Sequence, residues 1–539
     1  MVAIPESIRA HAEPALAFAD AHGTLTRVIL WVLAVPLLLG AFNTYKEYSY
    51  RSRSRKHGCD VPKYVSGFPF GIRTARLMYK AFKADEFVKG SAEQFYEYKA
   101  NTVRLQNVGA TSTVTMDPEN IKAVLATQFK DFDLGARYPQ FKPLLGDGIF
   151  TLSGNGWHHS RTLLRPQFTN EQVSRLQDIE HHIQILNELF TKKSAKGYFD
   201  AQDLFFKLTL DTATDFLFGE SVDTLKMENG VANEKLVKAN EFANAFNDGQ
   251  VWLLYRAVAQ SVYPLVTGPS FKKDIKVCQK FVEEYVDKAL ISANERDNDE
   301  KKKAAFENPN RYIFLDELTR ETRDPVLMRD QAINILLAGR DTTAGTLSFS
   351  IARLVRHPDI FKKLREAVLT DFGTNTDNIT FSTLKRCEYL KNFINEVLRF
   401  YPIVPVNARR ANRDTTLPRG GGPDESKPVF IPKGDEVLYS TYALHHNINI
   451  WGPDVEEFKP ERWENSKIPN WAYIPFNGGP RICLGQQFAL TEVGYTLVRI
   501  LQTFKEIRAP ADAINQEIKQ AASLTAAVAG GVHVQFIPA

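Results

Sequence analysis

One cysteine, Cys483, lies in a glycine-containing turn at residues 476–485 (FNGGPRICLG), directly before a helix-like run at 486–504. A thiolate at this place would meet helical N–H donors and the positive end of the helix dipole, and both favour its charged form. The glycines allow the backbone to approach a flat ligand, and Arg481 can pair with an anionic group on it. An iron–thiolate bond requires such a stabilised sulfur anion, close backbone and counter-charge. The turn therefore predicts that Cys483 binds iron in a flat ligand.

The N-terminal region contains an uncharged apolar run at 28–42 (VILWVLAVPLLLGAF) that can extend to residue 45. At about 1.5 Å per residue, a helix of this length spans a bilayer only marginally. The basic residues gather after the run, within 46–56, which places the following residues in the cytosol by the positive-inside rule. We expect a short lumenal N-terminus (1–27), a transmembrane anchor (28–45), a basic and Pro/Gly linker (46–66) and one large domain (67–539). A cleaved signal peptide and a buried soluble helix are the alternatives.

Charge and cysteine content narrow the class of protein. A net charge of +4 over 539 residues is small, so charge alone gives no indication of nucleic-acid binding. The cysteines are Cys59, Cys278, Cys387 and Cys483, without a C-x-x-C pair or zinc-like spacing. This usage fits a reducing compartment better than a disulfide framework.

Segments with helical periodicity predominate in the body of the chain. We expect helices at 170–190, 202–217, 272–293, 330–355, 360–370, 384–400 and 485–503. Short strand-like runs lie at 111–116, 429–431, 436–441 and 532–537. The predicted fold class is mainly α with small β-sheets, plus the N-terminal transmembrane helix.

Two polar motifs lie on expected helices. Trp157 and Arg161 are four residues apart (GWHHSR), so a helix places both on one face, where they suit an anion. Taken alone, the pair also fits a core tryptophan beside a surface arginine. Asp341 and Thr342 interrupt a long apolar helical run (AGRDTT at 338–343), and a threonine hydroxyl there can bond a carbonyl four residues earlier. A polar face turned to solvent is the alternative for this motif.

Three charged residues form a further ordered pattern. Glu396 and Arg399 are spaced by three (EVLR), and Arg462 follows in FKPERW, fourteen residues before Phe476. If these charges are buried together, each must have a partner. We assign Glu396, Arg399 and Arg462 to structural support.

In this order, the motifs resemble those of the cytochrome P-450 superfamily of haem-thiolate monooxygenases, over roughly residues 60–539. The resemblance implies the α-rich haem-thiolate fold and haem b (iron-protoporphyrin IX), with Cys483 as the axial iron ligand. It implies that Thr342 hydrogen-bonds the activated oxygen and that Asp341 relays protons. The cofactor-binding residues implied are Cys483, Trp157, Arg161, Arg409, Arg481, Phe476 and Gly485. Whether Arg409 or Arg410 contacts a propionate, and whether His446 does, stays open here.

The whole chain looks most like the fungal n-alkane and fatty-acid hydroxylases of the endoplasmic reticulum membrane. The residues that carry this likeness are 415–422 (TTLPRGGG), Arg340 in the oxygen motif, and 488–490 (FAL). The likeness implies an apolar substrate, NADPH as electron source through an NADPH–cytochrome P-450 reductase, a single-pass anchor and a cytosolic catalytic domain. Some relatives carry a glutamate that esterifies the haem at the site of Ala338, so we expect a non-covalent haem here.

The rival interpretations use the same cysteine turn for other reactions. A haem-thiolate isomerase or dehydratase would not use external dioxygen and would not need the pair Asp341 and Thr342. Within the monooxygenases, a sterol or secondary-metabolite hydroxylase is the alternative. Candidate pocket residues are Leu336, Leu337, Val404, Val406 and Leu524.

Overall fold

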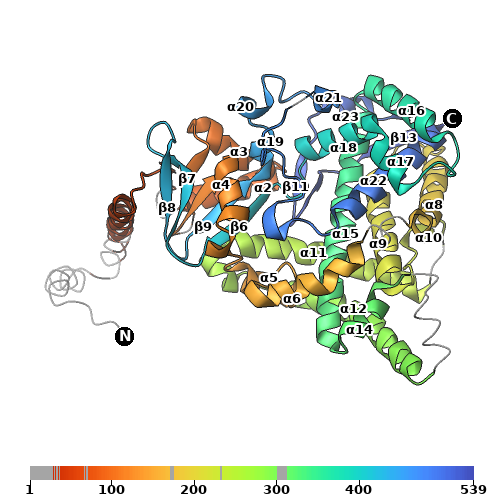
Figure 1. Cartoon of the computed structure of the whole chain (residues 1–539), viewed down its shortest axis with the longest axis horizontal. Coiled ribbons are helices and arrows are strands. Elements are labelled where there is room, and N and C mark those ends of the chain that lie inside the picture. Colours follow the sequence, from red (N-terminus) through yellow and green to blue (C-terminus); the bar gives the residue numbers. More distant parts are fainter. Residues whose placement is uncertain are drawn as a thin grey trace.

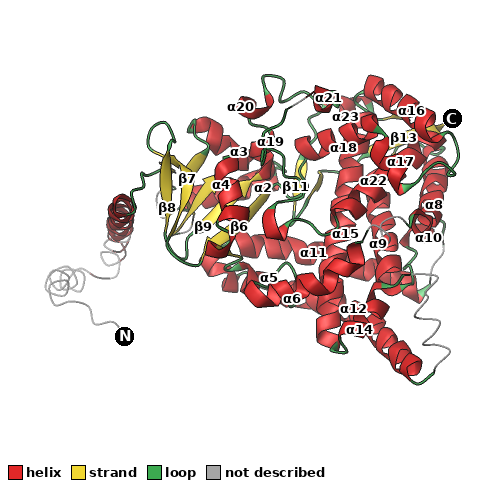
Figure 2. Cartoon of the chain, in the orientation of Figure 1, coloured by secondary structure: helices red, strands yellow, loops and turns green. Residues whose placement is uncertain are grey.

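The computed structural model describes residues 37–539 apart from 66, 68–70, 108, 170–174, 231–232, 300–311 and 466, together with positions 23, 28, 31 and 34. A large helical body adjoins a smaller region that holds most of the strands (Figures 1 and 2). The C-terminus lies in the helical body, on the side away from the strand-rich region (Figure 1). The predicted class, mainly α with small sheets, is confirmed for the described residues.

The helices of the described residues range from single turns to the 30-residue α15. The α-helices are α2 (Ile72–Lys83), α3 (Phe87–Glu97), α4 (Pro118–Lys122), α5 (Arg137–Leu145), α6 (Gly154–Leu164), α8 (Leu176–Ser194), α9 (Ala201–Phe218), α10 (Thr224–Met227), α11 (Glu234–Val258), α12 (Pro269–Asp297), α14 (Phe314–Glu321), α15 (Pro325–Leu354), α16 (Pro358–Phe372), α17 (Phe381–Arg386), α18 (Glu388–Phe400), α19 (Thr441–His445), α20 (Ile448–Trp451), α21 (Arg462–Asn465), α22 (Gln486–Thr503) and α23 (Ala511–Asn515). The short 3-10 or π segments are η1 (Ala123–Thr127), η2 (Phe129–Asp131), η3 (Arg165–Phe168), η4 (Gln260–Leu265) and η5 (Gly479–Arg481).

The strands form one larger sheet and several small ones. The larger sheet has the order β1-β2-β3-β9-β6-β4, and the smaller ones have the orders β10-β13-β5, β11-β12 and β7-β8. Their bounds are β1 (Lys63–Val65), β2 (Thr102–Asn107), β3 (Ala110–Thr115), β4 (Phe132–Asp133), β5 (Phe199–Asp200), β6 (Val406–Ala411), β7 (Thr415–Gly421), β8 (Lys427–Ile431), β9 (Glu436–Ser440), β10 (Phe504–Arg508), β11 (Gln520–Ala522), β12 (Ala526–Val528) and β13 (His533–Pro538). The sheet order brings β6, which carries Arg409, beside β9 in the larger sheet.

Helix α15 runs through the middle of the helical body (Figure 1) and packs against α9, α12 and α22. Pro325 at its first position follows the N-cap Asp324, whose carboxylate accepts from two backbone N–H groups. Most residues of α15 are buried, on every side of the helix, and α15 therefore has no polar face turned to solvent. Residues of α15 also line a cavity of the protein.

Several elements of the structure were not predicted or have other bounds, and the expected helix at 170–190 is described only from 176. The expected helix at 384–400 is two helices, because Cys387 is extended and ends α17 before α18 begins. The 25-residue α11 was not predicted from the sequence. The expected linker at 46–66 contains helical residues 46–56, part of a helix over 37–56.

The expected transmembrane anchor (28–45) lies partly outside the described residues, as do residues 1–22 before it. Among the residues that the structure describes, none of the helices is both long enough and apolar enough to cross a bilayer.

Candidate active site

The turn around Cys483 is closed by its own backbone. The Cys483 N–H donates to the Phe476 carbonyl at 3.0 Å, and the Ile482 N–H donates to the Gly479 carbonyl at 3.0 Å. Helix α22 follows at residue 486, as predicted. The Cys483 side chain is surrounded by protein, and its exposed surface faces a cavity. The turn thus presents the sulfur to an open space.

The glycines of the turn differ in what they allow. Gly479 has a φ of +65°, and a Cβ there would lie 1.9 Å from the Leu125 carbonyl oxygen, so only glycine fits. Gly485 has a φ of −87°. A Cβ on Gly485 would meet Phe168 at an ordinary 3.5 Å. Gly479 is therefore required by the turn itself, whereas Gly485 contributes an open surface to the cavity.

The electrostatic environment of Cys483 combines opposing effects. Burial in surrounding protein raises the pKa of its thiol, while the Gly485 N–H and the charge of Arg161 lower that pKa. The expected N–H donor is present, and Arg161 adds a cation that was not predicted for this role, but desolvation is the largest effect and leaves the pKa above its usual range. A bound metal ion deprotonates a coordinating thiol outright, and this would supply the remaining stabilisation.

The cavity lies between the cysteine turn and α15, and most of its wall is apolar. From α15 it is lined by Ala338, Gly339, Thr342 and Thr346. Other apolar lining residues are Phe150, Phe216, Ile335, Ile403, Val404 and Phe488. Of the five predicted pocket residues, Val404 lines the cavity, whereas Leu336 is fully buried in the core. Val406, Leu337 and Leu524 are also absent from its described wall.

Four arginines line the same cavity: Arg137, Arg161, Arg409 and Arg481. Burial, followed by repulsion from Arg409, lowers the pKa of Arg137 to about 10. Burial and the neighbouring arginines lower the pKa of Arg481 to about 9, against a weaker opposing effect of Asp133. Such crowded, partly desolvated cations favour a bound anion. The two carboxylates of haem, beside an accessible thiol, fit this arrangement.

Helix α6 places Trp157 and Arg161 on one face, as the spacing predicts. The Arg161 guanidinium lies 5.8 Å from the Trp157 ring centre, and that of Arg481 lies 4.4 Å from the same ring. Arg161 also donates to the Ile482 carbonyl at 3.1 Å. Trp157 therefore lies between a cation of the helix and a cation of the cysteine turn.

The structure separates the two neighbouring arginines of β6. Arg409 is 3% exposed and lines the cavity, and it donates to the Ala408 carbonyl at 2.7 Å. Its Nε has no hydrogen-bond partner in the described structure. Arg410 is exposed instead and donates to the Gly434 carbonyl at 2.7 Å. Arg409 is thus the arginine available to an anion in the cavity.

Two further residues clarify the cation set. Arg137, which sequence analysis missed, shares the Asn407 side-chain oxygen with Arg409, at 2.6 and 3.1 Å. No motif marks Arg137, because its position depends on the packing of α5 against β6.

His446 is absent from the described wall of the cavity, and its Nδ1 lies 2.9 Å from the Tyr442 carbonyl. Burial lowers the pKa of His446 to about 3, so the ring is neutral.

On α15, the Thr342 hydroxyl donates to the Ala338 carbonyl at 2.6 Å, the four-residue back-bond that was expected. The helix stays continuous through this turn. Thr342 lines the cavity, and its hydroxyl oxygen can still accept a hydrogen bond from a molecule bound there.

Asp341 points away from the described cavity wall, toward α11. Its carboxylate accepts from Gln250 at 2.6 Å and from Arg340 at 3.0 Å, and Arg340 also donates to Asn247 at 2.7 Å. Burial is the largest effect and raises the pKa of Asp341. Asp341 and Thr342 are therefore neighbours in sequence on different sides of the helix.

A second buried acid, Glu492 on α22, was missed by the sequence analysis. It is 2% exposed and lines the cavity, and the Thr212 hydroxyl donates to it at 2.7 Å. The Thr343 hydroxyl also forms a hydrogen bond with the Glu492 carboxyl group. Burial raises the pKa of Glu492 to about 7. A lone acid in an otherwise apolar helical stretch is the signal that could have revealed it.

The raised pKa of Glu492 predicts a pH-dependent stability. Burial raises the pKa of Glu492 from an ordinary 4.5 to about 7, so ionisation of this carboxyl group destabilises the folded state. The destabilisation is absent below the pKa of the unfolded state, grows as the pH rises from that pKa to the folded-state pKa, and stays constant at higher pH. For Glu492→Gln, we expect a free energy of unfolding about 1–3 kcal/mol above that of the wild type at pH 8, but not at pH 5.

Chemical unfolding at these two pH values measures the effect of Glu492→Gln. Glu506→Gln is the control, because Glu506 lies near the surface and its pKa is lowered by Arg508. A difference for Glu492→Gln that is equal at both pH values would contradict the assignment.

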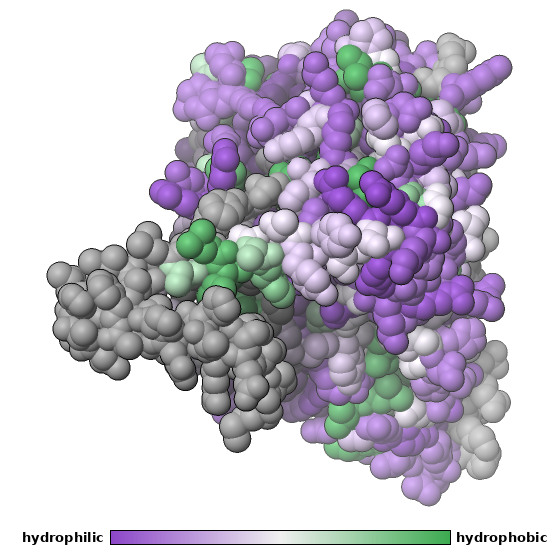
Figure 3. Space-filling view, turned by 90° about the vertical axis from the view of Figure 1, so that its left-hand side faces the viewer, coloured by the Kyte–Doolittle hydropathy of each residue, from purple (hydrophilic) through white to green (hydrophobic). Residues whose placement is uncertain are grey.

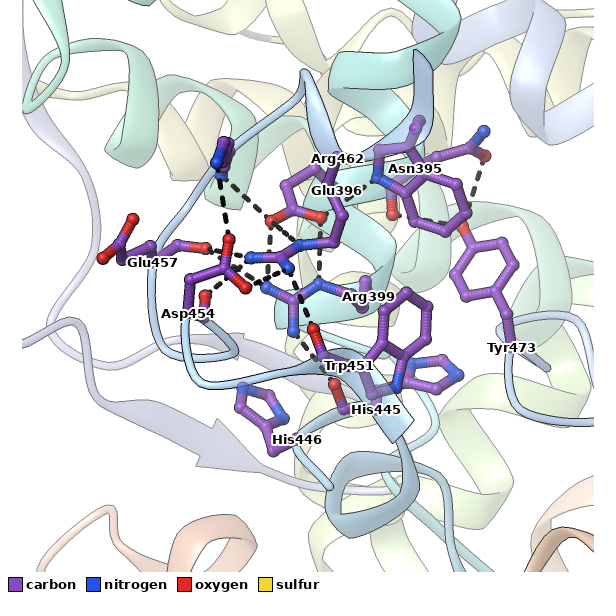
Figure 4. A network of polar contacts seen from close by, with 12 residues as sticks. Asn395, Glu396, Arg399, His445, His446, Trp451, Asp454, Glu457, Arg462 and Tyr473 are labelled. Carbon is purple, nitrogen blue, oxygen red and sulfur yellow. Dashed lines mark hydrogen bonds and ion pairs between the residues drawn. The ribbon is translucent and has the colours of Figure 1, made fainter. Parts of the chain in front are cut away.

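Glu396, Arg399 and Arg462, which the sequence analysis assigns to structural support, form one network of contacts (Figure 4). Arg399 donates to both oxygens of Glu396 at 2.9 Å, and both side chains are fully buried. Arg462 approaches Glu396 at 3.5 Å and donates to Asp454 at 2.8 Å. The Trp463 indole also donates to Glu396, at 3.0 Å. Every charge in the network has a partner, as burial requires.

The network is linked to the cysteine turn through His445. Arg399 donates to the His445 carbonyl at 2.9 Å, and His445 Nε2 accepts from the Ile474 N–H at 3.0 Å. Ile474 lines the cavity two residues before Phe476. Glu396 and Arg399 are absent from the described wall of the cavity, and Arg399 is connected through His445 to the backbone that leads to the cysteine turn.

Comparison with known proteins agrees with this geometry. The cytochrome P450 family profile matches residues 77–528. Cytochrome P450 52-E3 of Starmerella bombicola is 46% identical over 522 residues, 95% of this chain and 98% of that protein. Cytochrome P450 52A12 of Debaryomyces hansenii is 48% identical over 464 residues, 84% of this chain and 88% of that protein. Cytochrome P450 52A3-B of Candida maltosa is 46% identical over 490 residues, 87% of this chain and 91% of that protein.

Proposed function

The chain belongs to the cytochrome P450 family and is a haem-thiolate monooxygenase, and on that premise we propose that it hydroxylates long-chain fatty acids or n-alkanes at the terminal carbon. The proposal is carried by the cavity that Cys483 and Thr342 share, whose remaining wall is largely apolar. Apolar walls with a few placed polar groups suit an alkyl chain, which offers no polar handle near the reacting carbon.

The residues of the cavity have distinct roles in this proposal. Cys483 would hold the haem iron, while Arg161, Arg409 and Arg481 pair with the propionates. Trp157, Phe476 and Gly485 complete the surface against the cofactor. Haem bound through a thiolate supplies the dioxygen chemistry, since electron donation by the sulfur favours O–O cleavage. Ala338 offers no carboxylate for an ester, so we propose a non-covalent haem.

In this proposal, Thr342 would hydrogen-bond the activated oxygen and Asp341 would relay protons to it. The Thr342 hydroxyl donates its proton to the Ala338 carbonyl, and its oxygen can accept a hydrogen bond from a molecule in the cavity. Asp341 would be the proton source behind it, and its raised pKa suits that task. Gln250 holds the Asp341 carboxylate on the α11 side of the helix. We therefore propose that rotation of the Asp341 side chain, or a chain of water molecules, connects this carboxylate to the Thr342 hydroxyl.

A membrane location fits the proposed substrate, since alkyl chains partition into bilayers. We propose a lumenal segment 1–27, an anchor 28–45 in the endoplasmic reticulum, a connecting segment 46–66 and a cytosolic catalytic domain 67–539. Electrons would come from NADPH through a membrane-bound reductase. Exposed apolar residues support a lipid-facing surface: Ile72, Leu77 and Tyr79 on α2, and Leu265 at 83% exposure on η4. Figure 3 shows hydrophobic patches on the strand-rich face of the molecule.

The proposed function is tested in membranes that contain the full chain and an NADPH-dependent reductase. With dodecanoic acid, we expect ω-hydroxydodecanoic acid, formed only with NADPH and dioxygen and identified by mass spectrometry. Conversion without either co-substrate would indicate an isomerase or dehydratase. A substrate-binding spectral shift with sterols or aromatics, but not with fatty acids or alkanes, would overturn the substrate class.

The same assay examines Thr342. In Thr342→Ala we expect NADPH consumption to continue while product falls about tenfold or more and peroxide appears. Thr346→Ala is the matched control, since Thr346 lines the same cavity one turn later. Equal coupling in the two variants would remove Thr342 from its proposed role.

A further inference from the structure

The helix over 37–56 packs against the strand-rich region along one face. Its less exposed residues include Asn43, Glu47, Tyr50 and Ser54, spaced by four, three and four, which is a single helical stripe. Tyr50 is 4% exposed and Ser54 is fully buried. In Figure 1 this helix lies beside β8, at the end of the molecule where the chain begins. The segment is therefore docked on the body at this stripe.

Each residue of the stripe forms a specific polar contact with the body or with the turn that follows the helix. Asn43 accepts from Gln106 at 2.8 Å, Glu47 accepts from Arg104 at 3.0 Å, Tyr50 donates to the Phe430 carbonyl at 3.0 Å, and Ser54 donates to the Asp60 carbonyl at 3.3 Å. Gln106 and Arg104 belong to β2, and Phe430 belongs to β8. These contacts fix the rotation of the helix as well as its distance from the sheets.

Arg104 is the centre of the interface. Its guanidinium carbon lies 3.4 Å from the Tyr50 ring centre, and its nitrogens pair with Glu47 at 3.0 Å and Asp435 at 3.8 Å. The Arg104 side chain is only 10% exposed. Removal of this cation would leave Glu47 with only the more exposed Arg51 and would take its Arg104 ion pair from Asp435, which costs more than loss of a surface pair.

The N-terminal half of the same helix has a different character. Leu37, Leu38 and Phe42 are 74%, 65% and 47% exposed, so large apolar side chains there have little protein cover. These residues belong to the proposed anchor (28–45), and the helix continues without a break into the docked stripe. A helix of this length is a stiff rod of about 30 Å.

We propose that the helix over 37–56 is a rigid strut that holds the catalytic domain at one fixed tilt to the bilayer. The inference rests on the proposed membrane anchor and goes beyond it, because an anchor alone could tether the domain through a flexible linker. Since lipid-facing and docked residues share one continuous helix, the domain cannot tilt independently unless the helix or the Arg104 interface breaks. The partner of the exposed half is the acyl region of a lipid bilayer.

Haem orientation tests the strut without relying on activity. The full-length holoprotein is placed in aligned phospholipid bilayers, and the linear dichroism of the haem absorption gives the tilt and its spread. We expect strong dichroism in the wild type and loss of most of it in Arg104→Ala. Arg51→Ala is the matched control, because Arg51 pairs with the same Glu47 but is 54% exposed, and we expect its dichroism to be unchanged.

A second variant separates orientation from folding. A four-residue glycine–serine insertion after Tyr45 keeps the Arg104 interface but interrupts the helix, and we expect it to lower the dichroism as Arg104→Ala does. Undiminished dichroism in the insertion variant, or weak dichroism in the membrane-bound wild type, overturns the strut alone. A wild-type protein that fails to sediment with bilayers overturns the proposed anchor and the strut together.

Discussion

Replacement of Cys483 by serine is expected to abolish the thiolate-haem spectrum and reduce monooxygenase activity to background. Cys483 lines the cavity beside the cation cluster, and its sulfur is the donor that fits haem iron there. A serine hydroxyl is a harder ligand than a thiolate and keeps its proton near neutral pH, so it cannot supply the electron donation that favours O–O cleavage. The reduced carbon-monoxide complex is the measurement, and its red-shifted Soret band should disappear.

The remaining cysteines provide the matched control. Cys278 and Cys387 are 0% and 1% exposed, and neither contributes to the described wall of the cavity. Cys278→Ala and Cys387→Ala should keep the red-shifted band in whatever protein folds. A Cys483→Ser protein that retains the red-shifted band, or a loss of that band in folded Cys387→Ala, would show that the ligand has been misassigned.

Local sequence patterns predicted the parts of the site that depend on short spacings. Trp157 and Arg161 share a face because four residues make about one helical turn. The Thr342 back-bond likewise follows from its place inside an apolar helix. Cys483 could be located because its turn and the helix after it are contiguous in the chain.

Contacts between distant segments could not be read from such patterns. Arg137 reaches the cavity only because α5 packs near β6, and the two are some 270 residues apart, as the Arg137–Asn407 contact shows. The orientation of Asp341 depends on Gln250 from α11, a helix that the periodicity did not reveal. The basic segment 46–56 was interpreted as part of a linker, because its contact with the body depends on Arg104 from β2, which is distant in the sequence.

The pKa of Cys483 illustrates a related limit. Sequence analysis identified the N–H donors, which lower the pKa, but it did not place Arg161 beside the thiol and could not weigh these effects against desolvation, which is the largest. Burial depends on the assembled fold. The balance between the opposing electrostatic effects on this pKa therefore depends on the assembled fold as well. The same reasoning applies to Glu492, whose raised pKa arises where α22, α9 and α15 meet.

The other large effect is expected for Arg399→Ala, which should prevent accumulation of folded, haem-containing protein. Arg399 supplies two of the hydrogen bonds to the fully buried Glu396 carboxylate and one to the His445 carbonyl. Its removal leaves a buried charge without its main partner, at a cost of about 3–5 kcal/mol. That cost is a large part of the free energy of unfolding of a typical domain. Expression yield, haem content and the thermal melting midpoint measure the loss.

A matched substitution distinguishes this buried network from ordinary surface charge. Glu461 lies next to Arg462 but pairs with Lys363, whose side chain is 50% exposed, so Glu461→Gln should cost about 1 kcal/mol or less. Glu396→Gln should behave like Arg399→Ala, because it removes the anion that both arginines approach. If Arg399→Ala and Glu461→Gln melted at the same temperature with equal haem content, the network would not support the cysteine turn. Because His445 joins the network to the Ile474 backbone, we expect haem loss to precede global unfolding in partly stable variants of Arg399.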